Sequence, residues 1–276
     1  MSVLNDLDTV DLTTPLGTEV RGIQLRQLDD EGIAAITRLV AERGVLFFRD
    51  QPMTLDEQVA VGRRFGELMV HPAAKAPAGF PEVLVVHTDA ESTYTAGNGW
   101  HTDVSCEQRP PALSMLRLEE TPPAGGDTLW ASMYEAYETL SPAMQEFLLG
   151  LTAIHSGDKA YIGRYAKRAE PTDYPVSVHP VIRTHPVTGR KALYVNSGFT
   201  VRIKELTPRE SDALLDLLYD HIAYGVRFQV RFGWEPQSVA LWDNRCVQHH
   251  ASWDYYPATR SGFRVTTQGE APYLER

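Results

Sequence analysis

The sequence is poor in several features that would mark a specialised protein class. Only two of its 276 residues are cysteines, Cys106 and Cys246, which excludes a disulfide framework and a cysteine-rich zinc cluster and is typical of a reducing compartment. No apolar run approaches the roughly 18 residues needed to span a bilayer, and the acidic N-terminus lacks a secretory signal. We therefore expect a cytoplasmic protein with no membrane partner, in which both cysteines are packing residues.

Positive charge is also scarce. The chain has 26 Lys and Arg against 36 Asp and Glu, a formal net charge of −10. Because the basic residues are scattered, they form no stripe that could neutralise the phosphates of a nucleic acid, and we expect no nucleic-acid partner. A small anion is still compatible with this charge, since a few buried Arg or His residues set the local field of a pocket.

The rest of the composition is that of an ordinary folded protein. Hydrophobic residues make up 43% of the chain and charged residues 22%, which is enough apolar material for a sizeable core. No repeat, low-complexity tract or long linker divides the sequence. We expect one domain over residues 1–276.

Helix signals occur at four places. Residues 29–43 carry apolar residues at helical spacing and are followed by Gly44, which predicts a helix that ends there. Capping boxes at 54–57, 132–135 and 207–210 each predict that a helix begins after the first residue of the box.

Short strand-like runs lie between these helices. They cover residues 45–48, 83–87, 112–118, 128–131, 181–184, 192–195, 226–232, 239–242 and 263–267. Many short strands with helices outside them predict a mainly β protein with flanking helices (α+β), a sandwich or jelly roll, and not a doubly wound parallel sheet. Thr188-Gly189 is typical of a hairpin turn. No glycine-rich phosphate loop follows a strand, so we expect no nucleotide cofactor.

The most informative histidine is His101. In the stretch 100–103, His101 and Asp103 are two residues apart, so an extended backbone directs both side chains to the same side, where they can bind one ion. A second histidine from a distant strand would complete a facial triad, the arrangement suited to non-haem Fe(II), whereas zinc sites more often use a tetrahedral set. From the residues alone, either His249 or His250 can supply that ligand.

An HxD pair by itself is also typical of a strand-end histidine beside a capping aspartate, so the C-terminal context matters. Arg260 lies eleven residues after His249, which places a permanently charged, planar guanidinium on the next strand. Such a group can hold a carboxylate through two hydrogen bonds. A 2-oxoacid that chelates iron would leave a carboxylate at its far end for this arginine.

These stretches together resemble the taurine dioxygenase (TauD/TfdA) family of Fe(II)- and 2-oxoglutarate-dependent oxygenases. The resembling segments cover nearly the whole chain in order and are residues 65–72, 101–103, 125–130, 179–186, 195–200, 242–249, Arg260 and Arg264. Several spaced motifs are far more specific than one HxD pair.

The resemblance implies a double-stranded β-helix, the jelly-roll core of cupins. It implies iron held by the residues that match His101, Asp103 and His249. His249 is selected over His250 because the ligand of the family directly follows the glutamine of this motif, here Gln248.

The resemblance also implies a cosubstrate site. Residues that match Thr128 and Arg260 would hold the distal carboxylate of 2-oxoglutarate. Without the family context, Thr128 is an ordinary strand threonine.

The substrate head group is expected at His71 and Arg264, which match the residues that bind a sulfonate in sulfonate-binding members. Together they would hold a sulfonate, sulfate or carboxylate by charge-assisted hydrogen bonds. Taken singly, Arg264 could also be an ordinary arginine on a surface strand. His71 could likewise be an ordinary turn residue before Pro72. Residues 96–99 contain glycines where taurine-specific relatives have an Asn/Asp-rich stretch, which argues against taurine itself.

Three aromatic residues, Tyr161, Tyr165 and Phe199, lie in stretches that line the substrate side in similar proteins. Aromatic walls suit a larger apolar body, such as an alkyl sulfate or an aryloxyalkanoate. The same side chains would also suit a plain hydrophobic core.

The implied activity is hydroxylation of a C–H bond in a small anionic substrate, with O₂ and 2-oxoglutarate as cosubstrates and succinate and CO₂ as products. Oxidation next to a sulfonate, sulfate ester or aryl ether would fragment the product. Relatives are often dimers or tetramers, so a homo-oligomer is expected.

Two other functions use the same residues. A non-catalytic jelly-roll module that binds metal and 2-oxoacid would need a damaged triad or a missing carboxylate anchor, and neither defect is visible. A metal-dependent hydrolase would leave Arg260 without a role. Halogenation is disfavoured because Asp103 occupies the position that a halide would need.

Overall fold

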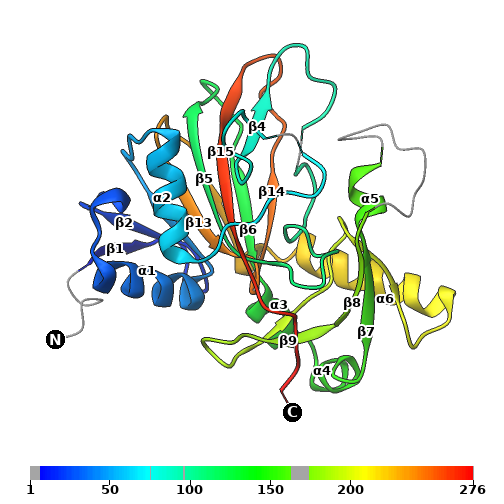
Figure 1. Cartoon of the computed structure of the whole chain (residues 1–276). Coiled ribbons are helices and arrows are strands. Elements are labelled where there is room, and N and C mark those ends of the chain that lie inside the picture. Colours follow the sequence, from blue (N-terminus) through cyan, green and yellow to red (C-terminus); the bar gives the residue numbers. More distant parts are fainter. Residues whose placement is uncertain (1–6, 75, 96, 163–173, 276) are drawn as a thin grey trace.

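The computed structural model describes residues 7–74, 76–95, 97–162 and 174–275, and the fold is mixed but mostly sheet (Figure 1). The largest sheet has seven strands in the order β1-β2-β3-β13-β5-β15-β4. All its neighbouring pairs are antiparallel except β2 and β3. Its strands are β1 (Asp8–Asp11), β2 (Thr18–Arg21), β3 (Val45–Phe48), β4 (Leu84–Thr88), β5 (Pro111–Glu120), β13 (Val239–Asp243) and β15 (Arg260–Gln268).

A second, three-stranded antiparallel sheet faces part of the first. Its order is β12-β6-β14, and its strands are β6 (Thr128–Ser132), β12 (Gln229–Phe232) and β14 (Val247–Ala251). Aromatic rings join the two sheets: Phe47 of β3 stacks on Phe232 of β12 with ring centroids 4.0 Å apart. Trp130 of β6 meets Phe47 at 5.2 Å and Trp242 of β13 at 5.9 Å. Edge-to-face and offset contacts of this kind are favourable beyond the area they bury.

Six helices are assigned in the described part of the chain. They are α1 (Asp30–Arg43), α2 (Leu55–Phe65), α3 (Met133–Glu138), α4 (Pro142–Leu148), α5 (Gly157–Tyr161) and α6 (Pro208–Ala223), with short 3₁₀ turns at η2 (Leu25–Gln27) and η4 (Val226–Phe228). Of two smaller sheets, β11-β7-β8 lies beside α6 and β10-β9 lies beside α3. Their strands are β7 (Thr152–Ser156), β8 (Val176–Pro180), β9 (Ile182–Thr184), β10 (Lys191–Leu193) and β11 (Thr200–Ile203).

Strand β3 shows how the large sheet comes to be covered on both faces. All four of its residues are buried. Val45 and Phe47 join the core between the sheets, whereas Leu46 and Phe48 join a second core that includes residues of α1 and α2. Because successive side chains of a strand point to opposite faces, a continuous apolar run is required wherever both faces are covered.

Most of the predicted helix starts and strands are confirmed. Asp29 caps α1 by accepting a hydrogen bond from the backbone N–H of Gly32, and Gly44 ends the helix at φ 73°, where glycine is favoured. The capping box at Thr54 forms in full, and Ser132 and Thr207 begin α3 and α6. The predicted turn at 188–189 joins the antiparallel strands β9 and β10.

The prediction of a strand over residues 226–232 is wrong in its first half. Val226–Phe228 forms the 3₁₀ turn η4, and only Gln229–Phe232 pairs in a sheet. The backbone N–H of Phe228 donates to the carbonyl of Gly225, which closes the turn directly after α6. The alternation of apolar and polar residues predicted a strand here, but Val226 is exposed and only Phe228 packs into the core. An alternating sequence is therefore also compatible with a turn that places one side chain in the core.

Several elements of the structure were not expected from the sequence. Strands β1, β2, β7, β8, β11 and β14 and helices α4 and α5 were not predicted. Most of these are short, and β14 in particular reads Val-Gln-His-His-Ala, which has no alternation of apolar and polar residues.

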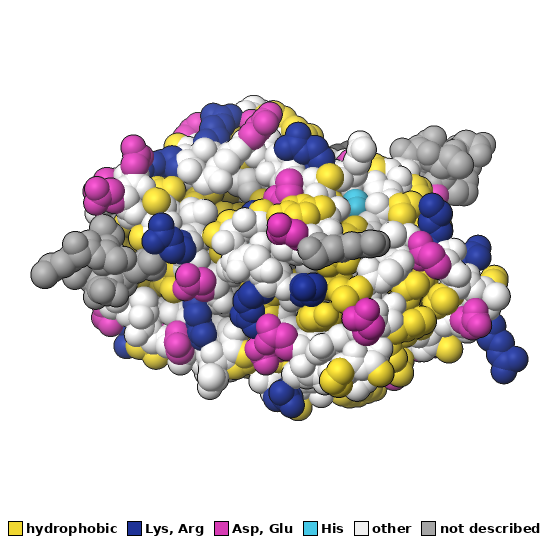
Figure 2. All heavy atoms as spheres, turned by 90° about the horizontal axis from the view of Figure 1, so that it is seen from below, with side chains coloured by type: hydrophobic (Ala, Val, Ile, Leu, Met, Phe, Trp, Pro, Cys, Tyr) yellow, Lys and Arg dark blue, Asp and Glu magenta, His cyan; other side chains and the backbone are white. Residues whose placement is uncertain are grey.

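Three further observations concern the surface, the helices and the cysteines. The face seen in Figure 2 carries acidic and basic side chains intermixed with apolar ones. No helix in the described ranges has both the length and the apolar character needed to traverse a bilayer. Cys106 and Cys246 are buried and not bonded to each other.

Candidate active site

A cavity of about 230 Å³ lies between strands of the two facing sheets. Strands β4, β5, β13 and β15 contribute residues from one side and β6 and β14 from the other. Loops complete the wall with His71, residues 97–101, residues 103–104 and residues 197–199, together with Ala160 and Tyr161 of α5. The pocket therefore collects side chains from most of the length of the chain.

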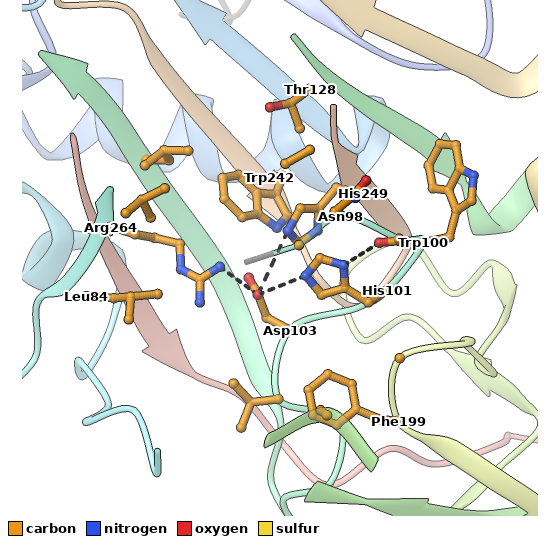
Figure 3. A pocket seen from close by; sticks show the side chains of 18 of the residues that line it. Leu84, Asn98, Trp100, His101, Asp103, Thr128, Phe199, Trp242, His249 and Arg264 are labelled. Carbon is orange, nitrogen blue, oxygen red and sulfur yellow. Dashed lines mark hydrogen bonds and ion pairs between the residues drawn. The ribbon is translucent and has the colours of Figure 1, made fainter. Parts of the chain in front are cut away.

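His101, Asp103 and His249 converge inside this pocket (Figure 3). Oδ1 of Asp103 lies 3.9 Å from Nε2 of His101 and 3.9 Å from Nε2 of His249. One nitrogen or oxygen from each of the three side chains lies within 4.8 Å of the others. His250, by contrast, packs its ring 5.8 Å from that of Trp100 and does not line the pocket.

The backbone around His101 differs from the extended segment predicted for it. His101 forms one isolated β-bridge with His249, and Asp103 lies in a turn. Within the bridge, the N–H of His101 donates to the carbonyl of His249 at 3.1 Å, and the N–H of His249 donates back at 2.9 Å. The two imidazoles are therefore brought together by paired main-chain hydrogen bonds.

The protonation of these groups suits metal binding. Nδ1 of His101 lies 2.8 Å from the carbonyl oxygen of Gly99, so this nitrogen carries the proton and Nε2 offers a lone pair. Burial lowers the pKa of both His101 and His249, which keeps the imidazoles neutral. Burial is the largest influence on Asp103 and opposes its ionisation. The charge of Arg264, the two neighbouring histidines and the hydrogen bond from Ser114 together outweigh it and hold the pKa of the carboxyl well below its ordinary value.

The donor set fits a divalent transition metal. Two neutral imidazole nitrogens and one carboxylate oxygen on one side of an ion form the facial arrangement preferred by non-haem Fe(II). Nδ1 of His249 is buried and has no hydrogen-bond partner among the described residues. No hydrogen bond from those residues therefore opposes the ring orientation in which Nε2 faces Asp103.

A second cluster of metal-ligating residue types, His185, Asp243 and Cys246, does not fit a metal. Asp243 is fully buried, and its oxygens already accept hydrogen bonds from Arg245 and from Nε2 of His185. These contacts compensate the carboxylate charge. The cluster is therefore a buried ion-pair network.

Arg260, the first residue of β15, is buried to 3% exposure. Its Nε donates to the carbonyl of Gly126 at 2.9 Å, and its Nη2 donates to Oγ1 of Thr128 at 3.1 Å. No carboxylate of the described residues lies within 4.0 Å of the guanidinium, and burial lowers the pKa of Arg260 to about 10. A buried cation without an acidic partner is costly unless an anion binds it.

Thr128 has a defined hydrogen-bonding role beside this arginine. Its hydroxyl oxygen accepts from Nη2 of Arg260 and from Nε1 of Trp234, the latter at 3.0 Å. Because two N–H donors use the lone pairs, the hydroxyl hydrogen is left to donate elsewhere. Neither Trp234 nor the carbonyl of Gly126 was predicted from the sequence as part of this site. Gly126 could have been considered, because it lies in the segment 125–130 that resembles the family, whereas Trp234 lies in none of the resembling segments.

Arg264 and His71 both line the pocket. Nη1 of Arg264 donates to Oδ1 of Asp103 at 2.7 Å, a contact that the sequence did not predict. Nδ1 of His71 accepts from the backbone N–H groups of Ala73 and Ala74, at 3.1 and 3.0 Å. Those two donors place the proton of His71 on Nε2, and burial lowers its pKa to about 4, so His71 is a neutral donor.

The aromatic residues Tyr161 and Phe199 form one part of the wall. Both are buried, with ring centroids 5.6 Å apart, and the ring of His71 lies 5.5 Å from that of Tyr161. Tyr165 lies outside the described residues. In the stretch 97–99, a Cβ on Gly97 would lie 3.2 Å from Cε1 of His101, so the close approach of this loop to the histidine favours glycine.

Comparisons with known proteins point to one enzyme family. The family model described as "Taurine catabolism dioxygenase TauD, TfdA family" matches residues 8–266. The chain is 39% identical over 274 residues to an alpha-ketoglutarate-dependent sulfonate dioxygenase of Saccharomyces cerevisiae, covering 95% of this chain and 66% of the yeast protein. It is 35% identical over 281 residues to an alpha-ketoglutarate-dependent sulfate ester dioxygenase of Pseudomonas putida, covering 97% and 91%.

Solved structures give the same result. A taurine dioxygenase from Burkholderia xenovorans superposes with a TM-score of 0.83 at 36% identity, covering 96% of this chain and 92% of the other. The protein AAD-2, solved in complex with Mn(II) and N-oxalylglycine, superposes with a TM-score of 0.86 at 25% identity, covering 97% and 99%.

Proposed function

Because the chain belongs to the taurine catabolism dioxygenase (TauD/TfdA) family, we propose that it is an Fe(II)- and 2-oxoglutarate-dependent dioxygenase that hydroxylates a C–H bond of a small organic anion. The observation that carries this proposal is the presence in one pocket of the triad His101, Asp103 and His249 and the buried, acid-free guanidinium of Arg260. The triad alone would suit many metal enzymes. The arginine adds a site for the carboxylate of a cosubstrate.

The chain's own residues would hold the metal and the cosubstrate. When bound at the triad, Fe(II) supplies the oxygen chemistry that couples conversion of 2-oxoglutarate to succinate and CO₂ with insertion of an oxygen atom into the substrate. Arg260 would hold the distal carboxylate of 2-oxoglutarate by charge-assisted hydrogen bonds, and Thr128 would donate its free hydroxyl hydrogen to the same group. The apolar residues Leu84, Val86 and Leu116 exclude water from the pocket.

The substrate class follows from the other polar groups of the pocket. Arg264 would attract an anionic head group, and Nε2–H of His71 would add a neutral hydrogen bond. Relatives are named for sulfonates and sulfate esters, which are monoanions. We assign this class to the chain, with an apolar body lying against Tyr161 and Phe199, and with aryloxyalkanoates as the carboxylate counterpart.

Hydroxylation of the carbon next to the head group would fragment such a substrate. A sulfate ester hydroxylated on its O-bearing carbon collapses to an aldehyde and sulfate, a sulfonate to an aldehyde and sulfite, and an aryloxyalkanoate to a 2-oxoacid and a phenol. The protein needs only to orient that carbon and to keep the site dry while the reaction proceeds.

Four broader features complete the proposal: the fold, the single domain, the location and the oligomeric state. The two facing sheets would form the double-stranded β-helix of the cupins, within one catalytic domain over residues 1–276. The chain would act in the cytoplasm as a homo-oligomer, a dimer or tetramer. Light scattering coupled to gel filtration measures the oligomeric state.

The test of the function is succinate formation under air with Fe(II), ascorbate and 2-oxoglutarate. Alkanesulfonates, taurine, alkyl sulfates and aryloxyalkanoates are compared, and released sulfite, sulfate and phenol are assayed alongside. We expect succinate and the matching anion or phenol to form in equal amounts with one substrate group. A metal-dependent hydrolase would instead release the anion without succinate and would be supported by Zn(II), and that result would refute the proposal.

A further inference from the structure

The second oxygen of Asp103 has a partner of its own. Ser114, in the middle of β5, donates its hydroxyl hydrogen to Oδ2 of Asp103 at 2.8 Å. Ser114 is fully buried and Asp103 is 3% exposed. Oδ1, the oxygen that faces His101 and His249, is therefore not the one that Ser114 holds.

Ser114 is one of two polar residues, with Arg117, in the buried part of β5. Leu113 and Met115 point to the core that includes residues of α1 and α2, whereas Leu116 faces the pocket. Ser114 lies on the same face of the strand as Leu116, because side chains alternate. It is thus a polar residue on the pocket side of β5, in hydrogen-bond contact with Asp103.

Asn244 fixes the direction of the hydrogen bond from Ser114. Its Oδ1 lies 3.0 Å from Nε1 of Trp242 and 3.3 Å from the backbone N of Asp103, and both of those groups can only donate. The amide orientation is therefore determined, and Nδ2 donates to Oγ of Ser114 at 2.9 Å. Oγ1 of Thr266 lies 3.2 Å from the same oxygen.

The hydroxyl of Ser114 has one hydrogen to give. The amide of Asn244 can only donate to it and the carboxylate of Asp103 can only accept from it, so the hydrogen goes to Oδ2. The hydroxyl of Thr266 then serves as the donor in its contact with Ser114. Asn244 is 1% exposed, so water does not compete within this chain of contacts.

We propose that Ser114 and Asn244 are positioning residues that lock the Asp103 carboxylate so that Oδ1 alone is presented to the metal. A carboxylate that can turn offers both oxygens to one cation. Holding Oδ2 on Ser114 leaves more of the metal's positions for cosubstrate and oxygen. This inference rests on the proposed function, because it requires the metal to bind at His101, Asp103 and His249.

The same network reaches the second histidine. Asn244 holds the indole N–H of Trp242, and the ring of Trp242 packs 4.9 Å from the imidazole of His249. A single amide thus links the orientation of the carboxylate to the ring that packs against His249. Groups that orient metal ligands in this way commonly change metal affinity by ten- to a hundredfold when they are removed.

The test is a titration with Mn(II) alone, followed by the electron paramagnetic resonance signal of the free ion. We expect Ser114→Ala to weaken Mn(II) binding about ten- to a hundredfold. The matched control is Ser211→Ala, which removes another fully buried serine hydroxyl, one that accepts from the backbone N–H of Ile203 far from the pocket. The control should lower the melting temperature and leave Mn(II) affinity unchanged.

A spectroscopic measurement separates positioning from a general loss of stability. The visible absorption bands of Co(II)-loaded protein report the ligand geometry, and they should change in Ser114→Ala and in Asn244→Asp. In the latter variant two carboxylates compete for the one hydrogen of Ser114. If Ser114→Ala does not fold, Ser114→Cys, which keeps a weaker donor at the same place, should show a smaller change in the same direction.

Two results would overturn the proposal. Mn(II) affinity and Co(II) bands in Ser114→Ala and Asn244→Asp that match those of the unsubstituted chain would show that the network does not position the carboxylate. Unchanged Mn(II) affinity in Asp103→Ala would show that the metal binds elsewhere, and this second outcome refutes the proposed metal site itself.

Discussion

Arg264 and the metal-facing oxygen of Asp103 form a direct ion pair, with Nη1 of Arg264 2.7 Å from Oδ1. The guanidinium that is expected to attract the substrate therefore also touches a proposed metal ligand. A carboxylate oxygen has two lone pairs, so it can accept from Arg264 and coordinate a cation together. This contact places substrate recognition and metal binding next to each other.

The pair predicts a stability effect that depends on metal. Arg264→Gln removes the cation that compensates the buried Asp103, which should destabilise the metal-free protein by about 3 kcal/mol. Mn(II) supplies a replacement charge, so the difference from the unsubstituted chain should shrink when Mn(II) is added. Urea unfolding in EDTA and in excess Mn(II) measures both values. Equal destabilisation in the two conditions would argue against a metal on Asp103.

Replacement of Arg260 should affect the cosubstrate specifically. Arg260→Gln removes the charge proposed to hold the distal carboxylate, and we expect the KM for 2-oxoglutarate to rise about ten- to a hundredfold. Binding of N-oxalylglycine to the Mn(II)-loaded protein, measured by calorimetry, should weaken to a similar extent. The control is Arg202→Gln, an exposed arginine on β11 that contacts the carbonyl of Leu206. An unchanged affinity in Arg260→Gln would place the carboxylate elsewhere.

Asp254 should act on the same cosubstrate through the backbone of one residue, Gly126. Oδ1 of Asp254 accepts from the N–H of Gly126 at 2.8 Å, and the carbonyl of Gly126 accepts from Nε of Arg260 at 2.9 Å. We expect Asp254→Ala to raise the KM for 2-oxoglutarate about fivefold with little change in kcat, the effect of one hydrogen bond. Asp254→Asn, which keeps an acceptor for Gly126, should remain close to the unsubstituted enzyme. A lower kcat with the KM unchanged would contradict this role.

The neutral state of His71 predicts discrimination by substrate charge. Of the two residues proposed to hold the head group, only Arg264 is charged, because the proton of His71 is confined to Nε2. An alkyl phosphate monoester is mostly a dianion at pH 7.5, since its second pKa is about 6. The alkyl sulfate of the same chain length should therefore bind at least about tenfold more tightly, which competition assays measure. Equal inhibition by both esters would show that the pocket does not select on charge.

His71 also predicts how stability changes with pH. Burial lowers the pKa of His71 from its ordinary value of 6.5 to about 4, so between these values the unfolded chain binds more protons than the folded one. This contribution to stability is complete above pH 6.5 and is lost as the pH falls toward 4. His71→Asn, which keeps an acceptor for Ala73, should flatten the dependence of the melting temperature on pH over this interval. His87→Asn, a change at a half-exposed histidine, is the control.

Local signals in the sequence predicted the elements whose own residues determine them. Helix α1 has its cap and its glycine stop within one segment, and β3 is apolar throughout because both faces are covered. Strand β14 was missed because Gln248, His249 and His250 replace the usual alternation. One of the polar residues that conceal this strand, His249, lines the pocket.

The site itself was predicted unevenly. The residues expected around the pocket came from spaced motifs, and the structure brings His101, Asp103 and His249 within reach of one ion. The pairing of Arg264 with Asp103 and of Trp234 with Thr128 could not be predicted, because each joins strands or loops that are far apart in the chain. Ser114 did carry a signal, as one of two polar residues, with Arg117, in the buried run 111–118.

The β-bridge between His101 and His249 has a consequence for the assembly of the site. Its two main-chain hydrogen bonds form when the chain folds. The entropic cost of bringing these two distant segments together is therefore part of the free energy of folding and not of metal binding. An arriving cation then needs to order only side chains. We therefore expect the metal-free pocket to be preorganised. Little of the free energy of metal binding should then be lost in ordering the backbone, so the measured affinity for the cation should be higher than in a site that orders on binding.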